Sequence, residues 1–237
     1  MRFFVSGALM LAAVPAFCCG PFWNYPEEYY MFRAFDKDAR NTSEREANCA
    51  AWKRLARPYV READISDVVY GYSLEQMKGL LDDKDSDNSF VRYIASSGDR
   101  EAADFLVTAK SCEQARFEIN DPWYYPSKGE PVKAELEDVI DKSLSYKGKR
   151  LEDRYILQAV RAMFTLKMYG QIDSLWNARK WRLKDGVIRN MTLGYVAGAA
   201  YRTGDKERAL GYYKSKGDLK SLYEHYSKEG TYSGLLD

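Results

Sequence analysis

The sequence has 237 residues, of which 46% are hydrophobic, so the chain is long enough to bury a substantial core. Its 36 lysines and arginines nearly balance 35 aspartates and glutamates, and these charges are scattered along the chain. Because binding of nucleic acid needs clustered cations that contact phosphates, the charge pattern argues against a nucleic-acid partner.

Residues 1–18 have the pattern of a secretory signal peptide, in which Arg2 precedes an apolar run. The run covers about a dozen residues, whereas a membrane-spanning helix needs roughly 20, and no later segment is apolar enough to span. We therefore predict export to the periplasm or cell envelope, with cleavage after Ala16 or Cys18. Lipoprotein anchoring through Cys18 or Cys19 is the less favoured alternative, because a bulky phenylalanine precedes them.

Residues 19–42 form an aromatic segment that contains Pro21 and Pro26, so an irregular or extended backbone is expected. Trp23 and Tyr25 are candidate partner-binding residues, because their side chains combine an apolar face with a polar edge. The alternative is that this segment covers one end of a helical array.

Residues 43–120 are predicted to form a helical region. Ser43 and Ser73 each precede a glutamate or glutamine by three residues, which is the capping-box pattern. The helices that they begin are expected to end near Arg57 and Leu81.

The acidic loop that follows carries Asp83, Asp85 and Asp87 at alternate positions, as a calcium loop does at its start. The sixth position holds Asn88 where a calcium loop has glycine, and the twelfth holds Ile94 where it has glutamate. A solvated turn is the better interpretation, and we predict neither a metal site nor a cofactor.

A short helix is expected over residues 90–96, followed by a turn at Gly98-Asp99 and a helix over residues 100–119. Residues 121–130 form an aromatic, proline-containing loop, beyond which Pro131 is expected to begin a helix that reaches Leu144. Three aromatic side chains of this loop are further candidates for partner binding, Trp123, Tyr124 and Tyr125.

The clearest periodicity lies in the C-terminal region, residues 131–237. Turns are predicted at Gly170 and Gly204, which stand 34 positions apart (204 − 170), the period of tetratricopeptide repeats. The helices expected around these turns cover residues 151–169, 172–179, 187–201 and 206–215, with a final helix after Asp218.

Residues 199–213 resemble the centre of a tetratricopeptide repeat, in which an aromatic residue precedes a Gly-Asp turn and a small residue follows it. The residues that carry this resemblance are Tyr201, Gly204, Asp205, Ala209 and Tyr213. The resemblance implies an all-α fold in which antiparallel helix hairpins stack as a short α-solenoid. It also implies a concave groove, for which Tyr195, Arg202 and Tyr212 are candidate partner-binding residues.

The cysteines allow one disulfide in an oxidising compartment, either Cys49 to Cys112 or Cys19 to Cys49. The alternative for Cys112 is a buried thiol, because it continues the apolar stripe of the helix over residues 100–119. The single histidine, His225, has no predicted catalytic partner.

These patterns predict an exported, non-enzymatic scaffold that binds a protein or peptide in the cell envelope. The alternatives are a glycan-binding protein that uses its aromatic side chains, or the helical part of a cell-wall-acting enzyme. The sequence stops soon after a repeat-like helix without a polar capping helix, which solenoids generally need. We therefore expect the repeat end to be covered by a second copy, a partner or a missing C-terminal part.

Overall fold

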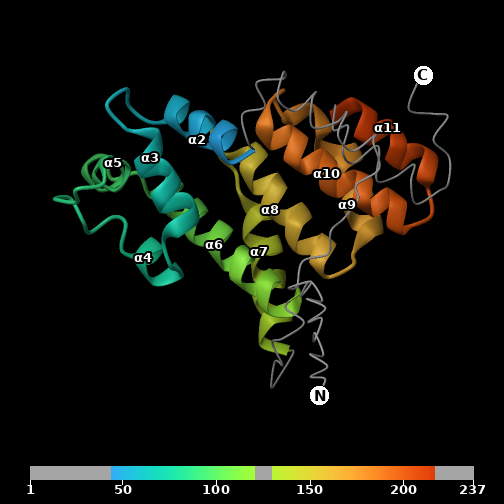
Figure 1. Cartoon of the computed structure of the whole chain (residues 1–237). Coiled ribbons are helices and arrows are strands. Elements are labelled where there is room, and N and C mark those ends of the chain that lie inside the picture. Colours follow the sequence, from blue (N-terminus) through green and yellow to red (C-terminus); the bar gives the residue numbers. More distant parts are fainter. Residues whose placement is uncertain (1–43, 121–129, 217–237) are drawn as a thin grey trace, which may run out of the picture. The chain divides into compact units, whose positions relative to one another are not determined.

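The computed structural model describes residues 44–120 and 130–216, which form ten α-helices and contain no strand (Figure 1). This confirms the all-α fold class. None of these ten helices combines the length and apolar character that crossing a membrane requires. The helices are α2 (Glu44–Leu55), α3 (Glu62–Ser66), α4 (Leu74–Lys78), α5 (Ser89–Ser97), α6 (Arg100–Asn120), α7 (Glu130–Ser145), α8 (Glu152–Thr165), α9 (Tyr169–Arg179), α10 (Val187–Arg202) and α11 (Lys206–Lys216).

Local capping fixes several helix ends as predicted. At the start of α4 the backbone N–H of Gln76 donates to Ser73 Oγ at 3.2 Å, and the backbone N–H of Ser73 donates to Gln76 Oε1 at 2.8 Å. Between α5 and α6, Gly98 adopts a left-handed conformation with φ of 62°, and Asp99 Oδ1 accepts from the N–H of Ala102 at 3.1 Å. The α5–turn–α6 unit is therefore confirmed.

The helices from α6 to α11 pack against their neighbours in a regular order. Each helix contacts the next along the chain, from α6·α7 to α10·α11, and α8 also contacts both α6 and α10. Figure 1 shows α8, α10 and α11 side by side, coloured from yellow to red. This arrangement is solenoid-like, because consecutive helix pairs bury their apolar faces against one another. In addition α2, distant in sequence, contacts α10.

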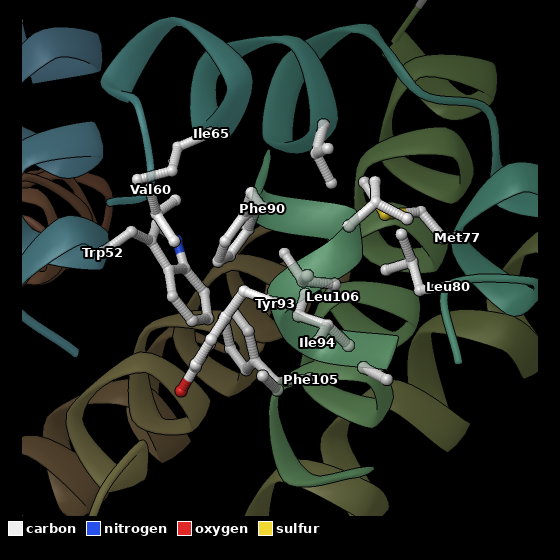
Figure 2. Close-up of a cluster of buried hydrophobic side chains, with 14 of the residues drawn as sticks. Trp52, Val60, Ile65, Met77, Leu80, Phe90, Tyr93, Ile94, Phe105 and Leu106 are labelled. Carbon is white, nitrogen blue, oxygen red and sulfur yellow. The ribbon is translucent and has the colours of Figure 1, made fainter. Parts of the chain in front are cut away.

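An N-terminal hydrophobic cluster includes Trp52 of α2 (Figure 2). The Trp52 ring lies 5.7 Å from the ring of Phe90 and 5.6 Å from that of Phe105, measured between centroids. Phe105 in turn meets Tyr155 of α8 edge to face at 5.1 Å. These aromatic contacts join α2, α5, α6 and α8 into one core.

A second hydrophobic cluster lies among α6 to α10. It contains Leu136 from α7, Val160 from α8, Trp176 from α9 and Leu193 from α10, all almost completely buried. The two helices α6 and α8 contribute residues to both clusters, so the N-terminal helices and the C-terminal stack share a continuous framework.

The predicted turn at Gly170 is wrong. Helix α8 ends at Thr165, and Gly170 is the second residue of α9. The left-handed residue of this turn is Lys167, with φ of 60°, and the N–H of Met168 donates to the carbonyl of Met163 at 2.8 Å. Glycine is the usual residue at the left-handed position after a helix, but here that residue is a lysine. A turn predicted from the position of glycine is therefore misplaced.

The structure also contains a helical segment that the sequence did not reveal. Helix α3 continues into a π-helical turn, Asp67–Gly71, and buries Ile65 and Val68 completely. Asp64 in α3 accepts hydrogen bonds from the backbone N–H and the hydroxyl of Ser89, the first residue of α5. The segment thus fixes the start of α5 from a distance in sequence.

The proposed disulfide between Cys49 and Cys112 is wrong, because both are buried free thiols. Cys49 belongs to the N-terminal cluster and Cys112 to the second cluster, where its Sγ faces the carbonyl of Gln158 at 4.0 Å. The alternative interpretation of Cys112 as a buried apolar residue of the α6 stripe is confirmed.

Candidate binding groove on helix α10

A hollow of about 510 Å³ lies along α10 and is bordered by α8, α11 and the first residue of α2. Four aromatic side chains line it, Phe164, Tyr195, Tyr201 and Tyr213. Two arginine or lysine side chains and one carboxylate complete its rim, Arg202, Lys216 and Glu44. We call this hollow the α10 groove.

The floor of the α10 groove depends on two glycines that stand one helical turn apart in α10, Gly194 and Gly198. A Cβ atom placed on Gly198 would lie 3.0 Å from Cε2 of Phe164, so any side chain at this position would press on that ring. A Cβ on Gly194 would lie 3.5 Å from Nζ of Lys216. Since neither glycine has a side chain, the α8 and α11 residues can approach α10 closely.

The aromatic wall of the groove is held by neighbouring rings. The Phe164 ring meets Tyr169 at 5.4 Å and Tyr195 at 5.6 Å, both edge to face. The guanidinium of Arg116 lies 5.4 Å from the centroid of the Tyr195 ring. Because these rings are fixed from several sides, the wall is pre-formed for a ligand.

The charge at the groove is positive on balance. Lys216 Nζ lies 3.4 Å from Glu44 Oε1, so these two charges compensate one another. Arg202 is exposed and makes no ion pair with any other described residue. The guanidinium of Arg202 therefore offers a positive charge beside tyrosine rings.

Of the residues predicted to line a groove, the structure brings Tyr195 and Arg202 together in this hollow. Tyr212 does not line it, because its ring packs edge to face on Trp176 at 6.0 Å. Tyr201 and Tyr213 were assigned to packing within the repeat, yet both line the groove. This second role was not predictable, because aromatic residues at helical spacing usually fill a core.

The remaining residues of the repeat pattern lie as predicted around the turn between α10 and α11. Gly204 has a left-handed φ of 87°, and Asp205 Oδ1 accepts from the N–H of Arg208 at 3.1 Å. Ala209 is completely buried, which allows α11 to approach α10.

Several candidate residues fall outside the described ranges. These are Trp23, Tyr25, Trp123, Tyr124, Tyr125 and His225. Within residues 44–120 and 130–216, no three or more His, Cys, Asp or Glu side chains are grouped so that they could hold a metal ion.

No protein-family model matches the chain, and no curated protein or solved structure is significantly similar to it. The resemblance to tetratricopeptide repeats therefore stays a prediction.

Proposed function

We propose that this protein is a non-enzymatic scaffold that binds a short peptide segment of a protein partner in the α10 groove. The observation that carries the proposal is an exposed guanidinium, Arg202, beside a fixed wall of aromatic rings. Aromatic and arginine side chains dominate binding energy at protein interfaces. A volume of about 510 Å³ also falls within the range typical of ligand sites.

The chemistry of the groove selects a particular kind of peptide. Tyr195, Tyr201 and Tyr213 present ring surfaces on which an aromatic or aliphatic side chain packs. Arg202 favours a carboxylate, either an acidic side chain or a peptide C-terminus. The preferred occupant is therefore a segment that combines an aromatic residue with a negative charge.

A selection from a displayed random-peptide library tests this directly. We expect enriched peptides to combine aromatic and acidic residues, and their affinity to fall about tenfold or more in the variant Arg202→Glu, which corresponds to roughly 1.4 kcal/mol. The matched control is Lys214→Glu, which reverses an exposed charge in the last turn of α11 outside the groove. Equal losses in the two variants, or enrichment of peptides without acidic residues, contradict the proposal.

Export to the cell envelope is part of the same proposal and is supported by the charged and apolar pattern of residues 1–18. Cell fractionation with N-terminal sequencing tests it. We expect a mature protein that begins after Ala16 or Cys18, whereas a cytosolic protein that begins at Met1 contradicts it.

A further inference from the structure

A second cavity lies deeper in the molecule, enclosed by residues of α2, the π-helical turn, α4, α6, α8 and α10. Its volume is about 110 Å³, and it shares only Met191 with the α10 groove. A water molecule occupies roughly 30 Å³ in the liquid, and a cavity of about 150 Å³ can hold benzene. At about 110 Å³ the cavity lies between these two volumes, so it has room for a few water molecules or for an organic molecule smaller than benzene.

The most unusual group in this cavity is the buried guanidinium of Arg154, a residue that is only 3% exposed. It stacks 4.1 Å from the centroid of Trp52, and Nη1 donates to Asn48 Oδ1 at 2.7 Å. No carboxylate of the described residues forms an ion pair with it. Burial lowers the pKa of Arg154 to about 10, although the neighbouring Asp153 acts in the opposite direction. A charge in this state is costly unless an anion compensates it.

Two further cations line the same cavity. Arg161 Nη1 donates to Gln158 Oε1 at 3.0 Å, while its Nε is buried without a hydrogen-bond partner in the described structure. Lys110 has a side chain only 6% exposed and pairs with Glu113 at 3.2 Å, so that this carboxylate is already engaged. Arg154 and Arg161 therefore remain as two positive charges that pair with no carboxylate in the part of the chain that the structure describes.

The rest of the lining is largely apolar. Trp52 from α2, Phe105 from α6 and Leu157 from α8 contribute apolar surface. Arg154, Gln158 and Arg161 stand at positions i, i+4 and i+7 of α8, so their side chains share one face of that helix. The cavity thus combines guanidinium donors with an apolar compartment.

We propose that this cavity binds a small organic acid, with its carboxylate held by Arg154 and Arg161 and its apolar body packed against Trp52, Phe105 and Leu157. A guanidinium presents its N–H donors in a planar fork that matches the two oxygens of a carboxylate. The carboxylate of the ligand compensates the positive charge of Arg154 and accepts a hydrogen bond from the Nε–H of Arg161. This site is independent of peptide binding in the α10 groove.

Calorimetric titration of the whole protein with propionate tests the proposal, alongside propionamide and inorganic phosphate at matched ionic strength. We expect propionate to bind with one site per chain and to raise the melting temperature saturably by a few degrees, because a ligand that binds only the folded state stabilises it. Propionamide has nearly the same shape without the charge, so it should not bind. Binding of phosphate without binding of propionate overturns the choice of a carboxylate.

Variants separate the site from a general charge effect. Arg154→Gln and Arg161→Gln should each weaken propionate binding at least tenfold, whereas Arg92→Gln, which removes an exposed charge on α5, should leave it unchanged. Arg161 is partly exposed, so Arg161→Gln provides the test if Arg154→Gln fails to fold. Unchanged binding in the folded cavity variants, or a lack of propionate binding to the original protein, overturns the proposal.

Discussion

Replacement of Gly198 by alanine probes the contact on which the α10 groove is built. The new Cβ atom would lie 3.0 Å from Cε2 and 3.2 Å from Cζ of Phe164, closer than ordinary van der Waals contact. The Phe164 ring cannot move freely, because Tyr169 and Tyr195 flank it at 5.4 and 5.6 Å. The substitution therefore strains α8 against α10.

Two opposing effects determine how far Gly198→Ala changes the free energy of unfolding. Alanine in place of glycine within a helix stabilises by about 1 kcal/mol, whereas overpacking of a tight contact costs roughly 1–3 kcal/mol. We expect a net destabilisation of about 1 kcal/mol, which lowers the melting temperature by roughly 2–4 °C.

The matched control is Gly211→Ala in the middle of α11, where a Cβ atom would have no described atom within 4 Å apart from those of its own stretch of helix. This variant gains the helix propensity without strain, so its melting temperature should rise by roughly 2–4 °C. Chemical denaturation followed by circular dichroism measures both free energies of unfolding. If Gly198→Ala stabilises as much as Gly211→Ala, Phe164 does not pack on this face of α10 and the described groove wall is wrong.

Three further predictions follow from contacts outside the groove. Asp64→Asn should lower the free energy of unfolding by about 1–3 kcal/mol at neutral pH. Burial raises the pKa of Asp64, but hydrogen bonds from Arg61 and Ser89 lower it by more. The pKa of Asp64 in the folded protein is therefore below its usual value. The stabilisation is present above the unfolded pKa of about 3.9 and is lost as the pH falls through the lower folded value, so a variant effect as large in strong acid as at neutral pH contradicts this account. Lys167→Gly should stabilise by about 1 kcal/mol in thermal or urea unfolding, because glycine tolerates a φ of 60° better than lysine, and a destabilised variant refutes this assignment. Cys49 and Cys112 should be recovered as free thiols after alkylation in denaturant and non-reducing peptide mapping, and a linked pair of peptides rules out the described packing.

Much of the fold was predictable because local signals agree with the final packing. The Ser73 capping box, the Gly98-Asp99 turn and the Gly204-Asp205 turn mark helix ends whose hydrogen bonds form within a few residues. Such signals do not depend on the rest of the chain, so the sequence displays them directly.

Features that depend on distant contacts escaped prediction. The segment that includes Asp64 is stabilised by Ser89, 25 residues away. The turn at Lys167 escaped for a local reason, because a lysine occupies the left-handed position where glycine is usual. Arg154 and Arg161 have the spacing of a solvated helix face, and only the packing of α2 against this part of the molecule shows that Arg154 is enclosed. The sequence patterns therefore could not predict this cavity.

Site-specific photocrosslinking tests peptide binding in the α10 groove most directly. A photoreactive residue placed at Tyr213, which lines the groove, should crosslink to a selected aromatic, acidic peptide, and the same residue at exposed Tyr59 should not. A crosslink at Tyr59 but not at Tyr213, or one from Tyr213 to the chain's own residues 1–43 or 217–237 in place of the peptide, contradicts the proposed function.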